Sequence, residues 1–255
     1  VRAGQAEFAL VPIENSVEGV VARTLDELAI GEQLVIVNEV TLPVEFALMA
    51  REKGAELKKI ATHPHAEAQC RSFIAKNYPN AEIIFTSSTA AAAEELAKGL
   101  HDGAIAAKTA ADNYKLVILN ENIGDNGGAV TRFVLVSKLG PVAAPTGHDR
   151  TTLAAFIGAD HAGALLEILT EFSVRGVNLT FIQSRPTGRE LGDYHFIIDT
   201  EGHINEARVA EALMGLRRIC EDVRFLGSYP RADKIAPTMP NRASDKSFKI
   251  GRAHV

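Results

Sequence analysis

The stretch FALVPIENS, residues Phe8–Ser16, decides the fold of the first half of the chain. Its apolar run from Phe8 to Ile13 predicts a buried strand of an α/β sheet. Three polar side chains, Glu14, Asn15 and Ser16, follow where this strand ends. Because ligands of open α/β sheets bind at the carboxyl ends of the strands, these three residues are candidate ligand contacts.

Strand and helix patterns alternate after this stretch. Ala, Glu, Lys and Leu recur at helical spacing in two segments, and Ser88 or Thr89 stands at the N-cap position of the second one. The free N–H groups at that helix end point out of the segment. The alternation predicts a mixed α/β domain over residues 1–139. The expected strands are Val35–Val40, Ile60–Thr62, Gly103–Ala107, Leu116–Leu119 and Val130–Val136, and the expected helices are Ala66–Asn77 and Thr89–Lys98.

A linker ends this domain. Residues Gly140–Asp149 contain Pro141, Pro145 and Gly147, a composition typical of connections. The pattern then restarts as strand, helix, strand, strand, helix and strand, which predicts a ferredoxin-like βαββαβ module over residues 150–230, with both helices on one face of an antiparallel sheet. The polar, Pro-rich composition that follows predicts a disordered tail over residues 231–255. The elements expected in the module are Thr152–Ile157, Ala164–Val174, Leu179–Ser184, Tyr194–Asp199, Glu206–Arg217 and Val223–Ser228.

Composition and charge exclude several classes of protein. The net charge is −5, and the basic residues are scattered, so no basic face for nucleic acid is expected. No window approaches the roughly 18 consecutive apolar residues of a membrane span. The two cysteines, Cys70 and Cys220, form no CxxC pair and stand near no histidine cluster, which indicates reduced thiols and a cytoplasmic protein.

Both ends of the sequence are unusual. The chain begins at Val1 without a methionine and runs at once into the first strand, which predicts that an N-terminal piece of the protein precedes it. The last residues, Lys249–Val255, read like a translated sequencing adapter and are left out of the fold reasoning.

Three polar clusters stand out in the apolar framework of the first domain. They are Glu14–Ser16 after a strand, Ser87–Thr89 before a helix and Thr131–Phe133 at the start of the last strand. No metal-ligand set and no glycine-rich phosphate loop accompanies them, so neither a metal nor another cofactor is expected. Hydroxyls, amides and one arginine suit a small anionic organic ligand. Plain structural interpretations also exist, with Ser88 as a helix cap and Arg132 as a solvated strand position.

Six short motifs occur in an order seen in one enzyme family. They are VPIENS (Val11–Ser16), HP followed by AxxQC (His63–Cys70), STAAAA (Ser88–Ala93), TRF (Thr131–Phe133), GALL (Gly163–Leu166) and QSRP (Gln183–Pro186). The chain resembles the prephenate dehydratases that carry a C-terminal ACT domain, over nearly all of residues 5–230. The resemblance implies two α/β lobes like a type II periplasmic binding protein, with the active site in the cleft between them. It also implies a hydro-lyase that converts prephenate to phenylpyruvate, with loss of water and CO2, in L-phenylalanine biosynthesis.

The resemblance implies roles for individual residues. Thr131 would donate a hydrogen bond or proton to the departing hydroxyl of prephenate. Arg132, the only cation in the three clusters, is the candidate to neutralise the pyruvyl carboxylate of that substrate. The other implied substrate contacts are Glu14, Asn15, Ser16, Ser88, Thr89 and Phe133. Phenylalanine would inhibit by binding between the ACT domains of a homodimer or homotetramer. Its implied contacts are Gly163, Ala164, Leu165, Leu166, Asn178, Leu179, Ser184, Arg185 and Pro186.

Three positions depart from the family pattern. Residues Gly127–Val130 replace the Asn that commonly precedes TRF, His65 replaces the Gln of HPQ, and Gln183 replaces the Glu of ESRP. The last change removes a charge beside the expected inhibitor site. Two alternatives stay open, namely an arogenate dehydratase and a non-catalytic amino-acid sensor built from the same two domains.

Overall fold

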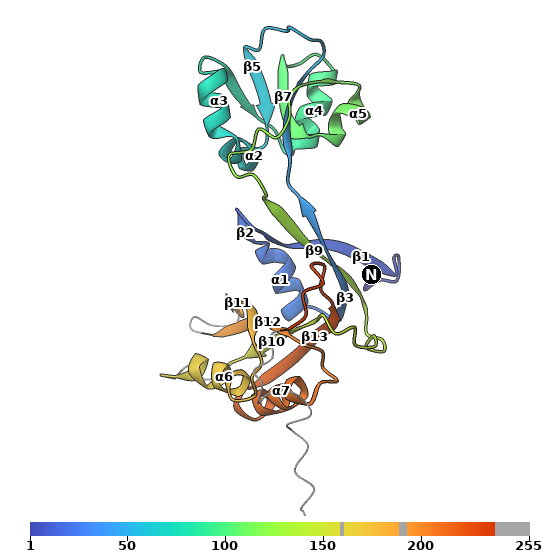
Figure 1. Cartoon of the computed structure of the whole chain (residues 1–255), viewed down its shortest axis with the longest axis vertical. Coiled ribbons are helices and arrows are strands. Elements are labelled where there is room, and N and C mark those ends of the chain that lie inside the picture. Colours follow the sequence, from blue (N-terminus) through green and yellow to red (C-terminus); the bar gives the residue numbers. More distant parts are fainter. Residues whose placement is uncertain (159–160, 189–192, 238–255) are drawn as a thin grey trace, which may run out of the picture. The chain divides into compact units, whose positions relative to one another are not determined.

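The structure is a computed structural model that describes residues 1–158, 161–188 and 193–237 (Figure 1). These residues form two compact units. The second unit contains Asn15–Gly19 and Leu42–Thr131, and the first unit contains the rest of the described chain. The peptide bonds that join the two units are Glu14–Asn15, Gly19–Val20, Thr41–Leu42 and Thr131–Arg132.

A five-stranded sheet forms the centre of the second unit, with the strand order β6-β5-β7-β4-β8. β5 runs parallel to β6 and β7, whereas β4 runs antiparallel to β7 and β8. The strands carry apolar residues on consecutive positions, as expected for a sheet that is covered on both faces. Their bounds are Phe46–Ala50 (β4), Lys59–Thr62 (β5), Glu82–Phe85 (β6), Gly103–Ala107 (β7) and Val117–Asn120 (β8).

Helices cover both faces of this sheet. Leu96 of α4 packs with Met49 of β4 in one buried cluster, and Ile74 of α3 packs with Leu48 of the same strand in another. Neighbouring residues of β4 therefore pack into the two buried clusters on opposite faces of the sheet, because side chains alternate along a strand. This arrangement is the mixed α/β fold that the sequence predicted. The helix bounds are Pro64–Gln69 (α2), Arg71–Asn77 (α3), Thr89–Ala97 (α4) and Thr109–Tyr114 (α5).

The single helix predicted over residues 66–77 is wrong, because the structure divides it at Cys70 into α2 and α3. Cys70 has φ −119° and ψ 13°, which is outside the helical region. The carbonyl of Gln69 accepts a hydrogen bond from the backbone N–H of Asp125 at 2.6 Å. The carboxylate of Asp125 in turn accepts one from the N–H of Ser72 at 3.0 Å. A distant loop therefore supplies hydrogen bonds at the break, which an uninterrupted helix would form within itself.

The first unit contains most of a second sheet, whose strand order is β2-β1-β9-β3. Ile13 of β1 is fully buried, as the FALVPIENS stretch predicted, and the strand extends to Asn15. A short helix, α1, follows β2. The bounds are Phe8–Asn15 (β1), Gly19–Val20 (β2), Ala22–Ala29 (α1), Leu34–Pro43 (β3) and Val130–Lys138 (β9).

A four-stranded antiparallel sheet completes the first unit, in the order β11-β12-β10-β13. Leu153 of β10 and Ile198 of β12 pack with Phe172 of α6 and Leu216 of α7. The order of elements along the chain is βαββαβ, so the predicted ferredoxin-like module is confirmed. The bounds are Asp149–Phe156 (β10), Ala164–Ser173 (α6), Leu179–Pro186 (β11), Tyr194–Glu201 (β12), Ala207–Ile219 (α7) and Asp222–Pro230 (β13).

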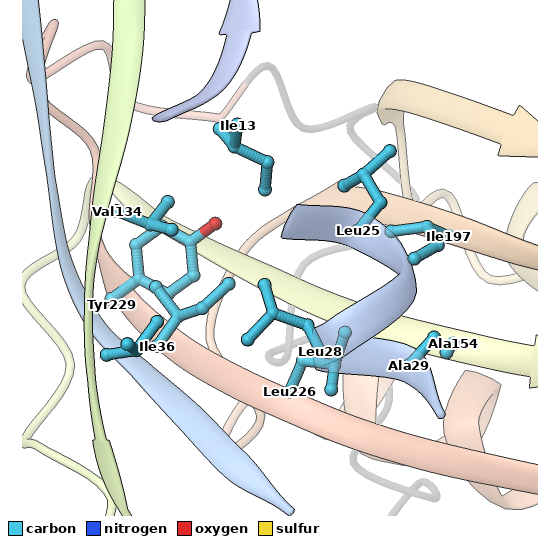
Figure 2. Packing of buried hydrophobic residues seen from close by; sticks show 11 residues of the cluster. Ile13, Leu25, Leu28, Ala29, Ile36, Val134, Ala154, Ile197, Leu226 and Tyr229 are labelled. Carbon is cyan, nitrogen blue, oxygen red and sulfur yellow. The ribbon is translucent and has the colours of Figure 1, made fainter. Parts of the chain in front are cut away.

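The C-terminal sheet packs its other face on α1 and the N-terminal sheet (Figure 2). Leu25 and Leu28 of α1 belong to one buried cluster with Ile197 of β12 and Leu226 of β13. Burial of a side chain of this size contributes about 1.5–3 kcal/mol. Because the first unit combines residues from both predicted domains, the domain boundaries at residues 139, 150 and 230 remain predictions.

Arg231 and Ala232 contact the strands of the first unit, so the predicted disordered tail does not begin at Arg231. Arg231 is buried, and its guanidinium binds the carboxylate of Glu201 at 3.2 Å. The next backbone N–H donates a hydrogen bond to Glu39 at 2.9 Å. The polar composition suggested disorder, but these polar groups find charged partners. Residues 238–255 of the predicted tail lie outside the described residues.

Gly227 brings β13 against the backbone of β3. Its φ is +137°, and a Cβ placed there would lie 2.2 Å from the carbonyl oxygen of Ile36. A backbone atom has no rotamer by which to move away. We therefore expect Gly227→Ala to lower the free energy of unfolding by about 3 kcal/mol or more, through overpacking and backbone strain. Denaturant unfolding followed by circular dichroism measures this change.

Gly158→Ala is the matched control for this substitution. A Cβ at Gly158 would lie 3.7 Å from the Cβ of Glu221, which is an ordinary contact. We expect this control to change the free energy of unfolding by less than about 0.5 kcal/mol. Unfolding midpoints that agree between the two variants would contradict the close approach of the two strands.

Candidate functional site

A hydrogen bond joins two of the predicted site residues, Asn15 and Thr131. The side-chain amide of Asn15 donates to the hydroxyl oxygen of Thr131, with 2.8 Å between Nδ2 and Oγ1. The residues are 116 positions apart in the sequence, and both belong to the second unit. The structure therefore brings a residue of the first polar cluster together with a residue of the third.

The turn after β1 fixes the orientation of the Asn15 amide. Its Oδ1 accepts hydrogen bonds from the backbone N–H groups of Val17 at 2.8 Å and Glu18 at 2.9 Å. Only the amide oxygen can accept these bonds, so the amide nitrogen must face Thr131. Thr131 accepts from that nitrogen, which leaves its own O–H group available as a donor.

Ser16 ties the end of β1 to the start of β9. Its N–H donates to the carbonyl of Val130 at 2.9 Å, and its Oγ accepts from the N–H of Val130 at 3.0 Å. Ser16 is exposed, and its hydroxyl proton is not needed for either bond. This pair of bonds holds Asn15 and Thr131 at neighbouring strand ends.

Three further residues interact at the turn, namely Glu18, Gln69 and His65, and the sequence analysis assigned no site role to any of them. Gln69 is buried, and its Nε2 donates to Oε1 of Glu18 at 2.9 Å. His65, which replaces a family Gln, places its Nδ1 3.7 Å from Oε2 of Glu18. Gln69 stands in the AxxQC motif, which was a signal for it. Glu18 follows Asn15 by three positions without any pattern of its own, so nothing in the sequence pointed to it.

Ser88 and Thr89 form the start of α4, as predicted. The Ser88 hydroxyl oxygen accepts a hydrogen bond from the N–H of Ala91 at 3.0 Å, and the helix begins at Thr89. Ser88 is exposed and Thr89 is partly buried. The cap interpretation is therefore confirmed for Ser88. Its hydroxyl proton and the first N–H groups of the helix remain able to bind an anion.

Arg132 lies in a buried group of charges in the first unit. Its Nη1 is 2.7 Å from Asp199 and 3.4 Å from Glu39, and its Nε is 3.3 Å from Glu14. Burial alone lowers the pKa of the Arg132 guanidinium, but the charges of Asp199 and Glu39 outweigh this effect, so its pKa is raised. The alternative of a solvated strand position is wrong, because only 9% of the side chain is exposed.

This environment does not fit the predicted role of Arg132 as the cation for a substrate carboxylate. Three protein carboxylates already surround the guanidinium, and removing it from them would leave buried charges without a partner. Glu14 is one of the three, and its predicted substrate contact therefore competes with Arg132. Phe133, the remaining residue of the TRF motif, is partly buried in β9.

The predicted inhibitor contacts of the GALL motif begin α6. Gly163 precedes the helix with φ +97°, and a Cβ placed there would meet nothing within 4 Å. Ala164 is buried, whereas Leu165 and Leu166 are exposed. The N–H of Ala164 already donates to the carbonyl of His161 at 3.2 Å, and the left-handed glycine leaves open space in front of the N–H groups that follow it.

The other predicted inhibitor contacts lie along β11. Asn178 and Leu179 line a depression of about 620 Å³ beside the last turn of α6. Ser184 and Pro186 are exposed at the far end of the strand. Arg185 binds Asp26 of α1 through two hydrogen bonds of 2.8 and 2.7 Å, so its guanidinium is already paired.

Neither a metal site nor a membrane-spanning helix is found in the described part of the chain. No group of three or more His, Cys, Asp or Glu side chains within residues 1–158, 161–188 and 193–237 could hold a metal ion. Over the same ranges, no helix has both the length and the apolar composition that a membrane crossing requires.

Family models match both halves of the chain. A model described as prephenate dehydratase matches residues 1–140, and one described as ACT domain matches residues 152–218. Among curated proteins, a prephenate dehydratase from Amycolatopsis methanolica is 46% identical over 250 residues, which covers 97% of this chain and 82% of that protein.

Solved structures agree with these matches. A prephenate dehydratase from Arthrobacter aurescens, crystallised in complex with L-Phe, is 50% identical with a TM-score of 0.90, over 97% of this chain and 83% of that chain. GqqA, described as a novel type of quorum quenching acylase, is 31% identical with a TM-score of 0.77, over 90% and 84%. One family model spans more than half of the chain, and the relative from Amycolatopsis methanolica matches almost all of it, so the chain belongs to the prephenate dehydratase family and carries an ACT domain.

Proposed function

We propose that this protein converts prephenate to phenylpyruvate, water and CO2, with Thr131 as the catalytic donor. The observation that carries the proposal is the hydrogen bond from Asn15 to Thr131. Because that bond uses a lone pair of the threonine oxygen, the O–H proton is free for the substrate. The departure of a hydroxide requires a hydrogen-bond donor that stabilises the negative charge on the leaving oxygen, and the Thr131 hydroxyl can act as that donor.

The reaction needs little beyond positioning and a hydrogen-bond donor. The bond between the ring and its carboxylate breaks, and the electron pair moves into the ring as CO2 leaves. The bond between C4 and its hydroxyl breaks at the same time, and the departing hydroxide, which accepts a hydrogen bond from Thr131, takes up a proton from solvent to become water. Aromatisation drives both steps. Thr131 lowers the barrier by stabilising the charge that develops on the departing oxygen.

Neutral donors hold the substrate carboxylates in this proposal. A strong ion pair on the ring carboxylate would oppose its loss as CO2, and Arg132 is already paired with Asp199. Ser16 and Ser88 both retain a hydroxyl proton for a ligand. The first N–H groups of α4, with Thr89 at its start, add the positive end of the helix dipole.

The direct test is turnover by the full-length protein. Prephenate is added, and phenylpyruvate is followed by its ultraviolet absorbance in alkali. We expect formation of phenylpyruvate that saturates with prephenate. A parallel reaction with arogenate, followed as phenylalanine formation, separates the second dehydratase alternative. A folded protein that binds phenylalanine but turns over neither compound would instead support the sensor alternative.

Asn15→Asp should lower kcat by about 10–100-fold, because an ionised carboxylate cannot donate to Thr131 and instead accepts its proton. KM for prephenate should change less, since the lost contact acts on the reacting hydroxyl. Steady-state kinetics on the purified variant give both values. Asn77→Asp is the matched control, because Asn77 also donates its amide, to the carbonyl of Phe73 at 2.9 Å, but on exposed α3. A loss of similar size in the two variants would contradict the role of Asn15.

We further propose that phenylalanine inhibits the enzyme by binding between the ACT domains of two subunits. Gly163 is the N-cap residue of α6, and the depression lined by Asn178 lies beside the last turn of the same helix. A helix of ten residues is about 15 Å long. One phenylalanine is too short to reach both ends of α6 in a single chain, so a pair of subunits would have to supply the two halves of the site.

A further inference from the structure

Four charged side chains form a buried group that we call the Arg132 cluster, namely Arg132, Arg150, Glu39 and Asp199. Arg132 contacts Asp199 at 2.7 Å, and Arg150 contacts Glu39 at 2.6 Å. Glu39 also lies 3.4 Å from Arg132. The cluster joins β9 and β3 of the N-terminal sheet to β10 and β12 of the ACT domain.

Asp199 has a fixed position in this cluster. Its Oδ1 accepts a hydrogen bond of 2.6 Å from the hydroxyl of Thr152, while its Oδ2 faces Arg132. The same Thr152 oxygen lies 2.6 Å from the hydroxyl of Tyr229, which is fully buried. The ACT sheet therefore determines where the Asp199 carboxylate lies, and the carboxylate determines where the Arg132 guanidinium lies.

The strand predicted to contact the inhibitor touches the same guanidinium. The Cζ of Arg132 lies 5.6 Å from the ring centre of Phe181, within the range of a cation–π contact. Phe181 pairs with Asp199 in the register of β11 and β12. The register shifts between Leu179 and Phe181, so an irregularity separates the predicted inhibitor contact from the ring over Arg132.

We propose that Asp199 and Phe181 are positioning residues. They connect β11, the strand of the ACT domain that is predicted to contact the inhibitor, to Thr131 through Arg132. Arg132 is the next residue to Thr131 in the chain, so a change in the backbone dihedral angles of Arg132 changes the orientation of Thr131. The inference rests on the proposed function and adds a route by which inhibitor binding reaches the reacting hydroxyl.

Buried charges make such a connection sensitive to small movements. An arginine held by buried carboxylates cannot lose one partner without a large loss of stabilisation, so the cluster favours discrete arrangements over gradual ones. Ligand binding at β11 acts on Arg132 only if it changes the position of Phe181 or Asp199. Coupling between two sites commonly changes affinity by about 5–150-fold, which two such contacts can supply.

The experiment compares three variants of the full-length enzyme. Asp199→Asn removes the charge that faces Arg132, and Phe181→Leu removes the ring but keeps an apolar side chain, so the second substitution perturbs the core less than the first. Glu201→Gln is the matched control. Glu201 lies two residues after Asp199 on β12 and forms a comparable buried ion pair, but its partner is Arg231.

Two quantities are measured for each protein, namely the Kd of phenylalanine by calorimetry and the fraction of activity that remains at saturating phenylalanine. The second is a ratio, so it does not depend on how much of the protein is folded. We expect Asp199→Asn and Phe181→Leu to bind phenylalanine within about 3-fold of wild type and to retain more than half of their activity at saturation. Glu201→Gln should be inhibited like wild type.

Full inhibition of both test variants would overturn the inference, as would equal loss of inhibition in the control. If Asp199→Asn fails to fold, Phe181→Leu decides the result alone. A wild-type enzyme that forms no phenylpyruvate would refute the proposed function itself. If the wild-type enzyme is active but phenylalanine does not inhibit it, and the variants behave in the same way, the proposed connection is refuted while the proposed function stands.

Discussion

Thr131→Ala should lower kcat by about 10²–10³-fold, the range found when a single hydrogen-bond donor to developing charge is removed. The substitution deletes the hydroxyl that accepts from Asn15 at 2.8 Å and that we expect to face the departing oxygen of prephenate. The site loses one hydrogen bond, so the free energy of unfolding should fall by only about 1 kcal/mol. Steady-state turnover of prephenate and denaturant unfolding of the same sample measure both effects.

Thr131→Ser is the control for this prediction. Serine keeps the hydroxyl but lacks the methyl group that restricts its rotamer, so we expect it to retain activity within about tenfold of wild type. Retention of more than a tenth of wild-type kcat by Thr131→Ala would show that another group stabilises the charge on the departing oxygen. A similar loss in the serine and alanine variants would show that the methyl group, and not the hydroxyl, carries the effect.

The sequence predicted the members of this site better than their contacts. The motifs named Asn15, Ser16 and Thr131, and the structure brings them together at neighbouring strand ends. The position of Thr131 beside Asn15 depends on a pairing of β1 with β9 across more than a hundred residues. Strand periodicity indicates which residues lie on a face, but it does not indicate which strand lies alongside.

Arg132 shows what local pattern could not supply. Its carboxylate partners come from three other strands, and the partner at 2.7 Å, Asp199, lies in the ACT domain. From the sequence alone, an arginine between Thr131 and Phe133 is compatible both with a ligand contact and with a solvent-exposed strand position. Burial by the packing of two sheets fits neither interpretation, and that packing rests on apolar residues of α1, which the sequence analysis did not predict as a helix.

The ferredoxin-like module was the part most completely predicted, because its signals are local. Apolar residues recur at a clear strand or helix spacing in each of its elements, and the segments between them are rich in glycine and polar residues. The second unit was predicted less fully. Its strands Phe46–Ala50 and Glu82–Phe85 and its helix Thr109–Tyr114 were not expected, because apolar runs this short do not distinguish a strand from a helix.

Gly163→Val should abolish inhibition by phenylalanine and leave prephenate turnover nearly unchanged. Gly163 has φ +97° and open space at its Cβ position, so the new side chain would fill the volume in front of the first N–H groups of α6. Those N–H groups and the positive end of the helix dipole are the expected holders of the phenylalanine carboxylate. Loss of that contact removes the difference in affinity by which phenylalanine selects an inhibited state.

Backbone strain must be separated from this steric effect, because a β-branched residue at positive φ destabilises by about 1–3 kcal/mol wherever it occurs. Gly147→Val provides the separation. Gly147 also has positive φ, at +87°, and no atom within 4 Å of its Cβ position, but it lies in the connection before β10. Both variants should show similar losses in unfolding free energy, and only Gly163→Val should bind phenylalanine more weakly. The measurement is turnover against phenylalanine concentration for wild type and both variants. Equal inhibition of all three would show that this turn does not hold the effector.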